Sequence, residues 1–244
     1  MASTTETGHA KNVANFEDFI SFVTAYGAIY NPSKASIKLA NLNAIFVQAK
    51  SDINNVMNKS VAYNNTSNIR ATLFEPLQRL STRLVQALSS TDATKELIKD
   101  AKTVNRKLQG KRAKGVETPT DPNAPAPTTI SASQQSYDQL IEHFSKLIEV
   151  LKSEPTYTPN ETDLKVVTLN TQLTAFKTAN TNVTNAYTAV SNTRIARDKT
   201  LYKENTGMYD VTGDVKNYVK SLYGISSPEF KQLSKIKFSK PKTA

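Results

Sequence analysis

The sequence predicts an all-α fold, a helical bundle built from two pseudo-repeats of about four helices each and joined by a Pro-rich linker. Three observations predict it. The stretch that begins at Tyr30 recurs at Tyr157, 127 residues later. Both copies carry apolar residues at helical spacing, and the sequence holds no pattern typical of a β-hairpin. A second copy at that distance favours a two-repeat protein.

The repeated positions keep their side-chain class across the shift. In the first part of the stretch, Tyr30, Pro32, Ile37, Lys38, Leu42, Asn43 and Phe46 match Tyr157, Pro159, Leu164, Lys165, Leu169, Asn170 and Leu173. Further along, Asn55, Val56 and Asn58 match Asn182, Val183 and Asn185. Matched spacing in two diverged copies is far less expected by chance than one such run.

The first helix of each half precedes the repeated stretch. Residues 15–26 are expected to form it in the first half, with Phe16, Phe19, Ile20 and Val23 on one face. Residues 134–152 are its counterpart, with Phe144, Leu147, Ile148 and Leu151 at a shift of 128 residues. The polar residues 1–12 are expected to form a disordered tail.

The second helix of each half carries a narrow apolar seam. In the first copy the seam comprises Leu39, Leu42, Phe46, Ala49, Ile53 and Val56, with steps of 3, 4, 3, 4 and 3. Asn31 before Pro32, and Thr158 before Pro159, are predicted N-caps, and Glu161 completes a capping box with Thr158. The first of these helices should weaken at residues 64–68, a run of poor helix formers.

The third helix of the first half carries Leu73, Leu77, Leu80, Leu84 and Leu88, and Pro76 should start or kink it. In the second half Leu201, Val215, Val219 and Leu222 are the expected counterparts, with a loop or break at Gly207 and Gly213. A fourth helix is predicted from about Asp92, with Leu97, Ala101, Val104 and Leu108 on one face. Its counterpart starts at Ser227-Pro228-Glu229, followed by Phe230 and Leu233.

These elements divide the chain into a tail (1–12), a first helical repeat (13–114), a Pro-rich linker (115–133) and a second helical repeat (134–244). The linker holds Pro119, Pro122, Pro125 and Pro127 among small and polar residues. The matching seams suggest that the halves pack on each other about a pseudo-two-fold axis. Two separate bundles are the alternative.

Composition limits the classes of protein that the sequence can encode. The chain has no cysteine, which fits a cytoplasmic location and leaves no thiol for disulfides, catalysis or metal binding. No apolar run approaches a membrane span, and the polar start lacks the apolar core of a signal peptide. The net charge of +10 permits an acidic partner, although a lysine-rich solvated surface explains it equally well.

Catalysis has little support in the sequence. The histidines are His9 in the tail and His143 on a predicted helix, and the acidic residues near His143 lack the spacing of a carboxylate-bundle metal site. Seven glycines form no phosphate-binding loop, and no serine lies in a nucleophile-elbow pattern. We therefore expect no enzymatic activity, cofactor or metal.

The basic residues are the best candidates for binding. Lys95, Lys99, Lys102 and Arg106 step by 4, 3 and 4 and form what we call the first basic stripe, which Lys111 and Arg112 extend. Lys231 and Lys235 form the second basic stripe, near the end of the second half. Such residues could contact an anionic partner, but any exposed amphipathic helix shows the same pattern. Arg70 and Arg197 also coincide under the shift; they could form an internal ion pair or face a shared cleft, or they are exposed helix residues that match by chance.

We expect a non-enzymatic helical structural or protein-interaction protein with a basic surface, whose partner is another protein or a second copy of itself. The alternative is a nucleic-acid-binding protein that uses the basic stripes on the fourth helix of each half. The first is favoured because the charge is explained without a ligand and no base-reading motif occurs.

Overall fold

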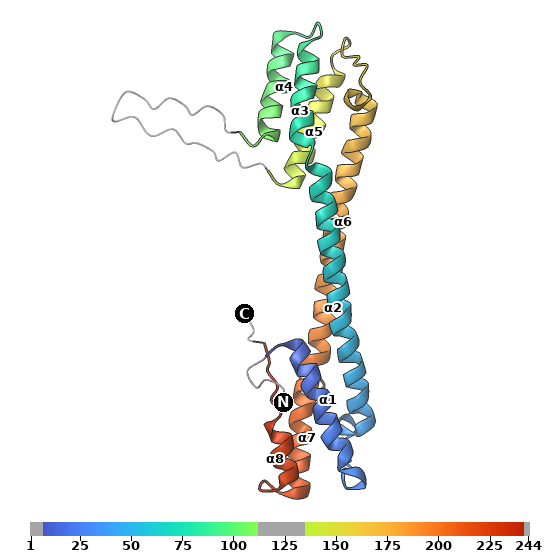
Figure 1. The fold of residues 1–244 in the computed structure, drawn as a ribbon, viewed down its shortest axis with the longest axis vertical. Helices are drawn as coiled ribbons and strands as arrows, with labels where there is room; N and C mark the ends of the chain where they lie inside the picture. The colour runs from blue at the N-terminus through green and yellow to red at the C-terminus, as the bar shows by residue number, and fades with distance from the viewer. Residues whose placement is uncertain (1–6, 112–134, 242–244) are drawn as a thin grey trace, which may run out of the picture. The chain divides into compact units, whose positions relative to one another are not determined.

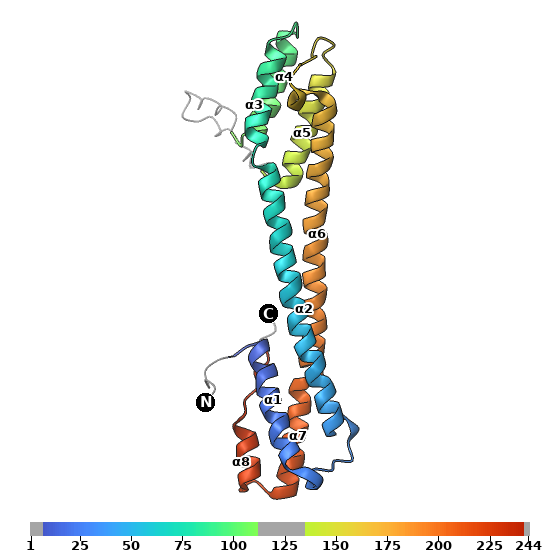
Figure 2. The ribbon, with the colours of Figure 1, turned by 45° about the vertical axis from the view of Figure 1, so that its right-hand side comes forward.

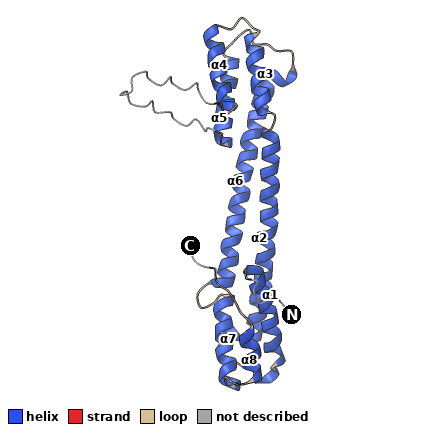
Figure 3. Ribbon diagram, turned by 60° about the vertical axis from the view of Figure 1, so that its left-hand side comes forward, coloured by secondary structure: helices blue, strands red, loops and turns tan. Residues whose placement is uncertain are grey.

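A computed structural model of the chain describes residues 7–111 and 135–241. All regular structure in these residues is helical, without a strand (Figure 3), which confirms the predicted all-α class. The predicted linker lies outside the described residues. The α-helices are α1 (His9–Ala25), α2 (Leu39–Phe74), α3 (Leu77–Ser89), α4 (Lys95–Leu108), α5 (Tyr137–Lys152), α6 (Val166–Tyr202), α7 (Met208–Tyr223) and α8 (Pro228–Lys235). Short 3-10 helices occupy Gly27–Ile29, Ala35–Ile37 and Thr162–Leu164.

The chain folds into two units, and neither coincides with one half of the sequence. The first unit takes residues up to 63 and from 186 onward, so it combines α1 and the start of α2 with the end of α6, α7 and α8. The second unit takes residues 64–185 and combines the end of α2, α3 and α4 with α5 and the start of α6. Each unit therefore draws helices from both halves.

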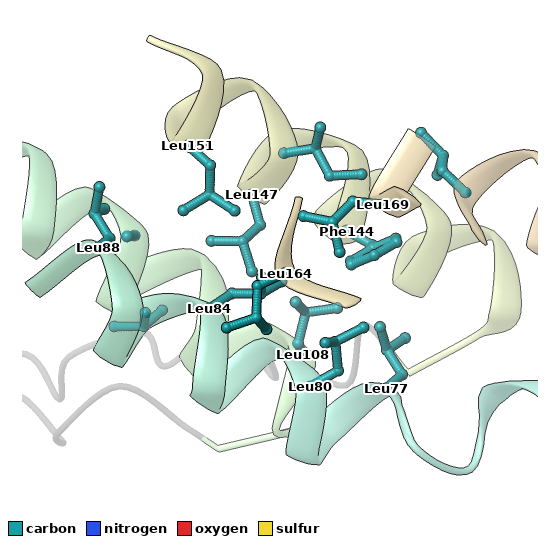
Figure 4. Close-up of a cluster of buried hydrophobic side chains, with 14 of the residues drawn as sticks. Leu77, Leu80, Leu84, Leu88, Leu108, Phe144, Leu147, Leu151, Leu164 and Leu169 are labelled. Carbon is teal, nitrogen blue, oxygen red and sulfur yellow. The ribbon is translucent and has the colours of Figure 1, made fainter. Parts of the chain in front are cut away.

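The second unit has a core of leucine and phenylalanine. Its helices α3, α4 and α5 lie side by side (Figure 1). Figure 4 shows side chains from these helices meeting those from the start of α6. The fully buried ones include Leu84, Leu88, Leu108, Phe144, Leu147, Leu151 and Leu169. Their 3.6-residue spacing was the sequence signal for these helices.

The first unit has a separate core with the same types of side chain. α7 packs against α8, and α1 joins them in the same unit (Figure 2). The buried side chains come from α1, α2, α6, α7 and α8, and include Phe16, Phe19, Val23, Leu42, Ala49, Leu201, Met208, Val215, Val219 and Leu233. α1 begins at His9, so residues 9–12 belong to this helix, and the polar tail ends earlier than expected.

The predicted N-caps of the long helices are wrong. α2 begins at Leu39 and α6 at Val166, in each case after a 3-10 turn that buries Ile37 or Leu164. The reason is a tyrosine upstream of each turn. Tyr30 donates its hydroxyl to the carbonyl of Ile37 at 2.6 Å, and Tyr157 donates to that of Leu164 at 3.0 Å. These bonds hold the chain in a turn where helical capping was expected.

The predicted weakening at residues 64–68 is also wrong, since α2 is continuous from Leu39 to Phe74. Contacts between the end of α2 and α6 favour the helix on the C-terminal side of this segment. In the second unit the ring of Phe74 stacks on Phe176, with centroids 4.2 Å apart, and Arg70 donates to the side-chain oxygen of Asn180 at 2.7 Å. Tertiary packing therefore decides the length of this helix.

Of the two predicted breaks in the second half, only the one at Gly207 exists. A Cβ at Gly207 would lie 2.5 Å from the Lys203 backbone nitrogen, so the tight turn between α6 and α7 requires glycine. Gly213 lies inside α7, and Leu222, an expected core residue, is exposed.

The predicted starts of the shorter helices are mostly confirmed. α3 begins directly after Pro76, and α8 begins at Pro228, where the Ser227 hydroxyl accepts from the Phe230 N–H at 3.1 Å. α4 was expected from about Asp92 and begins at Lys95, after a cap at Thr94, whose hydroxyl accepts from the Leu97 N–H at 3.2 Å.

Leu42 and Leu169 test the two cores separately, because both side chains are fully buried, one in each unit. Truncation of either to alanine should lower the free energy of unfolding by about 2–5 kcal/mol, since it removes apolar contacts and leaves a cavity. Urea titration followed by circular dichroism measures this cost. V167A, at a side chain that is 79% exposed, is the matched control and should cost less than about 0.5 kcal/mol. Equally small costs at both leucines would contradict the assignment of the buried face.

Candidate functional site

The first basic stripe occupies one exposed side of α4. Lys95, Lys99, Lys102 and Arg106 are exposed, whereas Ala101 and Leu108 on the opposite side are fully buried. None of the four cations forms an ion pair with a described residue, and their charge therefore faces solvent. The structure therefore brings these four predicted contact residues together.

The other predicted contact residues do not all join this stripe. Lys111 is exposed just beyond the C-terminus of α4, and Arg112 lies outside the described residues. Lys231 and Lys235 are exposed on α8, which belongs to the first unit, whereas α4 belongs to the second. The structure thus gives each unit its own basic helix.

Arg70 and Arg197, which match under the repeat shift, have different partners. Arg70 lies with its guanidinium carbon 3.9 Å from the centre of the Tyr137 ring and donates to Asn180. Asn180 in turn donates to the Asp138 carboxylate at 2.7 Å. The side chain of Arg197 is 13% exposed and pairs with Asp198 at 2.8 Å. Both arginines are thus partly buried and have side-chain partners, and the Nε of Arg70 is buried without a hydrogen-bond partner among the described residues.

His143 is buried on α5, with 2% of its surface exposed, and neither ring nitrogen has a hydrogen-bond partner among the described residues. Burial lowers the pKa of this imidazole, and the nearby positive charges of Lys107 and Lys146 lower it further. Glu142 acts in the opposite direction but does not outweigh these effects. The histidine is thus neutral at neutral pH.

The paired tyrosines at the start of the long helices serve the fold. Burial raises the pKa of Tyr157 to about 12 and raises that of Tyr30 as well. Each hydroxyl is already used to donate to a backbone carbonyl, as described above. Two protonated and bonded phenols are suited to fixing a turn and not to acid–base chemistry.

An exposed apolar set on α2 was missed by the sequence analysis. Val47, Met57 and Val61 are 66%, 57% and 54% exposed, and all three belong to the first unit. At 3.6 residues per turn they fall within about 80° of arc on one side of the helix. The buried Leu42 and Ala49 lie on another side. We call these three residues the α2 apolar set; the only signal in the sequence was their position outside the seam.

Two grooves flanked by α2 and α6 contain mostly polar residues. In the first unit Asp52 is 5% exposed and accepts from Gln48 at 2.9 Å and from the Thr200 hydroxyl at 2.6 Å. Both carboxylate oxygens therefore already have donors. In the second unit an open groove is lined by Thr66, Ile69, Thr171, Thr174, Ala175, Thr178, Ala179, Asn182 and Asn185. Neither groove has a free buried polar group that would indicate a ligand.

Residues 7–111 and 135–241 hold neither a metal cluster nor a helix suited to cross a membrane. No group of three or more histidine, aspartate or glutamate side chains in these ranges is placed to hold a metal ion. No helix in them combines the length and apolar character that a membrane crossing requires. Comparison with known proteins found no family model, no curated protein and no solved structure that matches the chain.

The buried His143 should make the second unit less stable in acid. Because its pKa is lowered in the folded state, its contribution to stability is complete above the ordinary histidine pKa of 6.5. As the pH falls below that value, the unfolded chain takes up a proton more readily than the folded chain, so stability is lost. H143L should remove this part of the acid sensitivity.

The measurement is the urea midpoint of both proteins at pH 7.5 and pH 5. His9, whose pKa is also lowered, is present in both proteins and cancels in the comparison. Equal loss of stability in the wild type and H143L would contradict the assignment.

Proposed function

We propose that the protein is a non-enzymatic structural or protein-interaction protein that presents its long helices to a protein partner or to a second copy of itself. The α2 apolar set is the observation that carries this proposal. Val47, Met57 and Val61 are all more than half exposed. Exposed apolar side chains on one side of a helix are stabilised when a partner covers them. Fully burying one such side chain contributes about 1.5–3 kcal/mol. Covering all three would therefore favour association by several kcal/mol before its entropic cost.

We also propose that the two halves of the sequence are copies of one helical unit, with the Pro-rich linker between them. The order of elements supports this: a short helix, a 3-10 turn, a long helix and two further helices occur in each half. The tyrosine-to-carbonyl bonds recur at the same 127-residue shift. A buried hydroxyl also recurs, since Ser81 in α3 and Thr212 in α7 each donate to the carbonyl three residues earlier.

Duplication of one helical unit supports an interaction role, because it provides two sets of similar surfaces and requires no active site. The residues that differ between the copies are then informative. Asp52 and Thr200 form a polar pair in the first unit, whereas the residues that match them under the 127-residue shift, Ala179 and Leu73, are apolar. The two units have therefore diverged in how α2 meets α6, and their exposed surfaces can serve different contacts.

Replacing Val61 with glutamate should weaken self-association, because it places a charge within the α2 apolar set. The wild-type protein is expected to gain mass with concentration in sedimentation equilibrium, and V61E should shift this equilibrium toward the monomer by about tenfold or more. N55E adds the same charge at an exposed position of α2 outside the set and should behave like the wild type. Equal association of V61E and wild type would contradict the use of this surface between copies.

The first basic stripe favours a second candidate function, binding of nucleic acid. Four exposed cations follow one side of α4, and none is paired with a described carboxylate. Such a stripe could neutralise backbone phosphates without reading base sequence. We favour the interaction role, because a basic surface of this size also arises from the net charge of +10 alone.

Binding to duplex DNA at increasing salt separates the two functions. A basic surface without a dedicated site should bind weakly, with binding lost by about 0.2 M salt. If the stripe binds phosphates, replacing Lys95, Lys99, Lys102 and Arg106 with glutamine should flatten the slope of log affinity against log salt by about three to four units.

A control with the same change in net charge replaces four other exposed lysines, Lys38, Lys59, Lys177 and Lys203. Tight, salt-resistant binding that this control keeps and the stripe variant loses would overturn our preference for the interaction role.

A further inference from the structure

The segment that follows α8 lies on the first unit as an extended peptide. α8 ends at Lys235, and Ile236 takes an extended conformation with φ −72° and ψ 114°. Side chains of α1 and α7 then contact the main chain of residues 236–239, which we call the C-terminal segment. Asn15 donates to the carbonyl of Lys237 at 2.7 Å, and Lys216 donates to that of Ile236 at 2.7 Å.

Asn12 makes the most specific of these contacts. Its amide nitrogen donates to the Ser239 carbonyl at 2.7 Å, and its amide oxygen accepts from the Ser239 N–H at 3.0 Å. One side chain thus satisfies both main-chain groups of one residue, as a neighbouring strand would. Asn12 itself is 2% exposed and also donates to the Tyr202 hydroxyl at 3.0 Å, which fixes its amide in place.

One aromatic ring anchors the segment. The ring of Phe238 lies 6.4 Å from that of Phe16 and 5.7 Å from that of Phe19, in both cases edge to face. The ammonium of Lys216 lies 5.5 Å from the centre of the Phe238 ring. Phe16 and Phe19 are fully buried, and Phe238 packs against their core. The site thus combines an aromatic pocket with donors and an acceptor for the peptide backbone.

The second unit completes its core in a different way. There the 14-residue helix α4 continues to Leu108, which is fully buried in the same core as Phe144. α8 has only 8 residues, and Phe238 enters its core from the non-helical segment instead. Leu108 is thus held within a helix, whereas Phe238 is carried by an extended segment outside any helix.

We propose that the surface formed by Asn12, Asn15, Phe16, Phe19 and Lys216 is a peptide-binding site, and that it takes the C-terminal segment of a second copy in exchange for its own. This rests on the self-association put forward above. Most of its polar contacts go to the peptide main chain, so they are the same whichever copy supplies the segment. Every copy carries both the site and its ligand, and exchange loses none of these contacts.

The first test measures whether the site binds the segment as a separate ligand. The probe is a fluorescein-labelled peptide of residues 233–241, and the receptor is the full chain carrying F238A, in which the resident segment has lost its anchor. Fluorescence anisotropy should show saturable binding to F238A and about tenfold weaker binding to the wild type, whose own segment competes. The same peptide with alanine at position 238 should also bind about tenfold more weakly.

I225A, at a side chain that is 64% exposed beyond α7, is the control receptor and should behave like the wild type. Circular dichroism checks that F238A keeps its helices. S239P, which removes the N–H bonded to Asn12, serves as the receptor if F238A does not fold. Failure of the peptide to bind a folded receptor with a released segment overturns the peptide-binding site.

The second test asks whether copies exchange the segment. Sedimentation equilibrium should show that F238A weakens the association of wild-type chains by about tenfold or more. If F238A associates as the wild type does while V61E does not, exchange is overturned and the proposed interaction role stands. If the wild type remains a monomer at all concentrations, exchange and self-association both fail, and only binding to a different protein survives.

Discussion

The fold depends on covering one narrow apolar side of each long helix. α2 and α6 are rich in asparagine and threonine, and their buried apolar residues lie in a single file that includes Leu42 and Ala49 on α2 and Leu169 and Phe176 on α6. A helix with so little apolar surface gains stability only by packing against neighbours. In the first unit these neighbours include α1 and α7, and in the second they include α3 and α5. These shorter helices therefore serve to cover the apolar sides of α2 and α6.

Much of this arrangement could be predicted from the sequence, because it rests on spacing within single helices. The seams, the phenylalanine pairs of α1 and α5, and the proline-marked starts of α3 and α8 are all local patterns. The starts of the long helices were mispredicted because the bond from Tyr30 to Ile37 spans a turn that resembles a cap in sequence. The division into units could not be predicted for a different reason. It depends on which helices of the first half pack against which helices of the second, and no pattern within a single helix indicates this.

The candidate sites were predictable to a smaller extent. Charge spacing correctly placed four cations on one side of α4. The α2 apolar set was overlooked because periodicity identifies a buried face but does not say which other apolar residues stay exposed. The peptide-binding site depends on Asn12 and Ser239, which are 227 residues apart. Asn12 was assigned to the polar tail, and nothing in the pattern of residues around it indicates that it will bind a main chain. The surfaces proposed for association could therefore be identified only from the structure.

Hydrogen–deuterium exchange of the L42A variant shows whether each unit is built from both halves of the sequence. Leu42 lies in the first half, in a core that includes Val215 and Val219 of α7 and excludes the core residues of α3 and α4. Because Leu42 shares its core with α1 and α7, amide exchange should become faster in these helices, with little change in α3, α4 and α5. Faster exchange in α3 and α4 with α7 unaffected would contradict this expectation, because the first half would then behave as one folding unit.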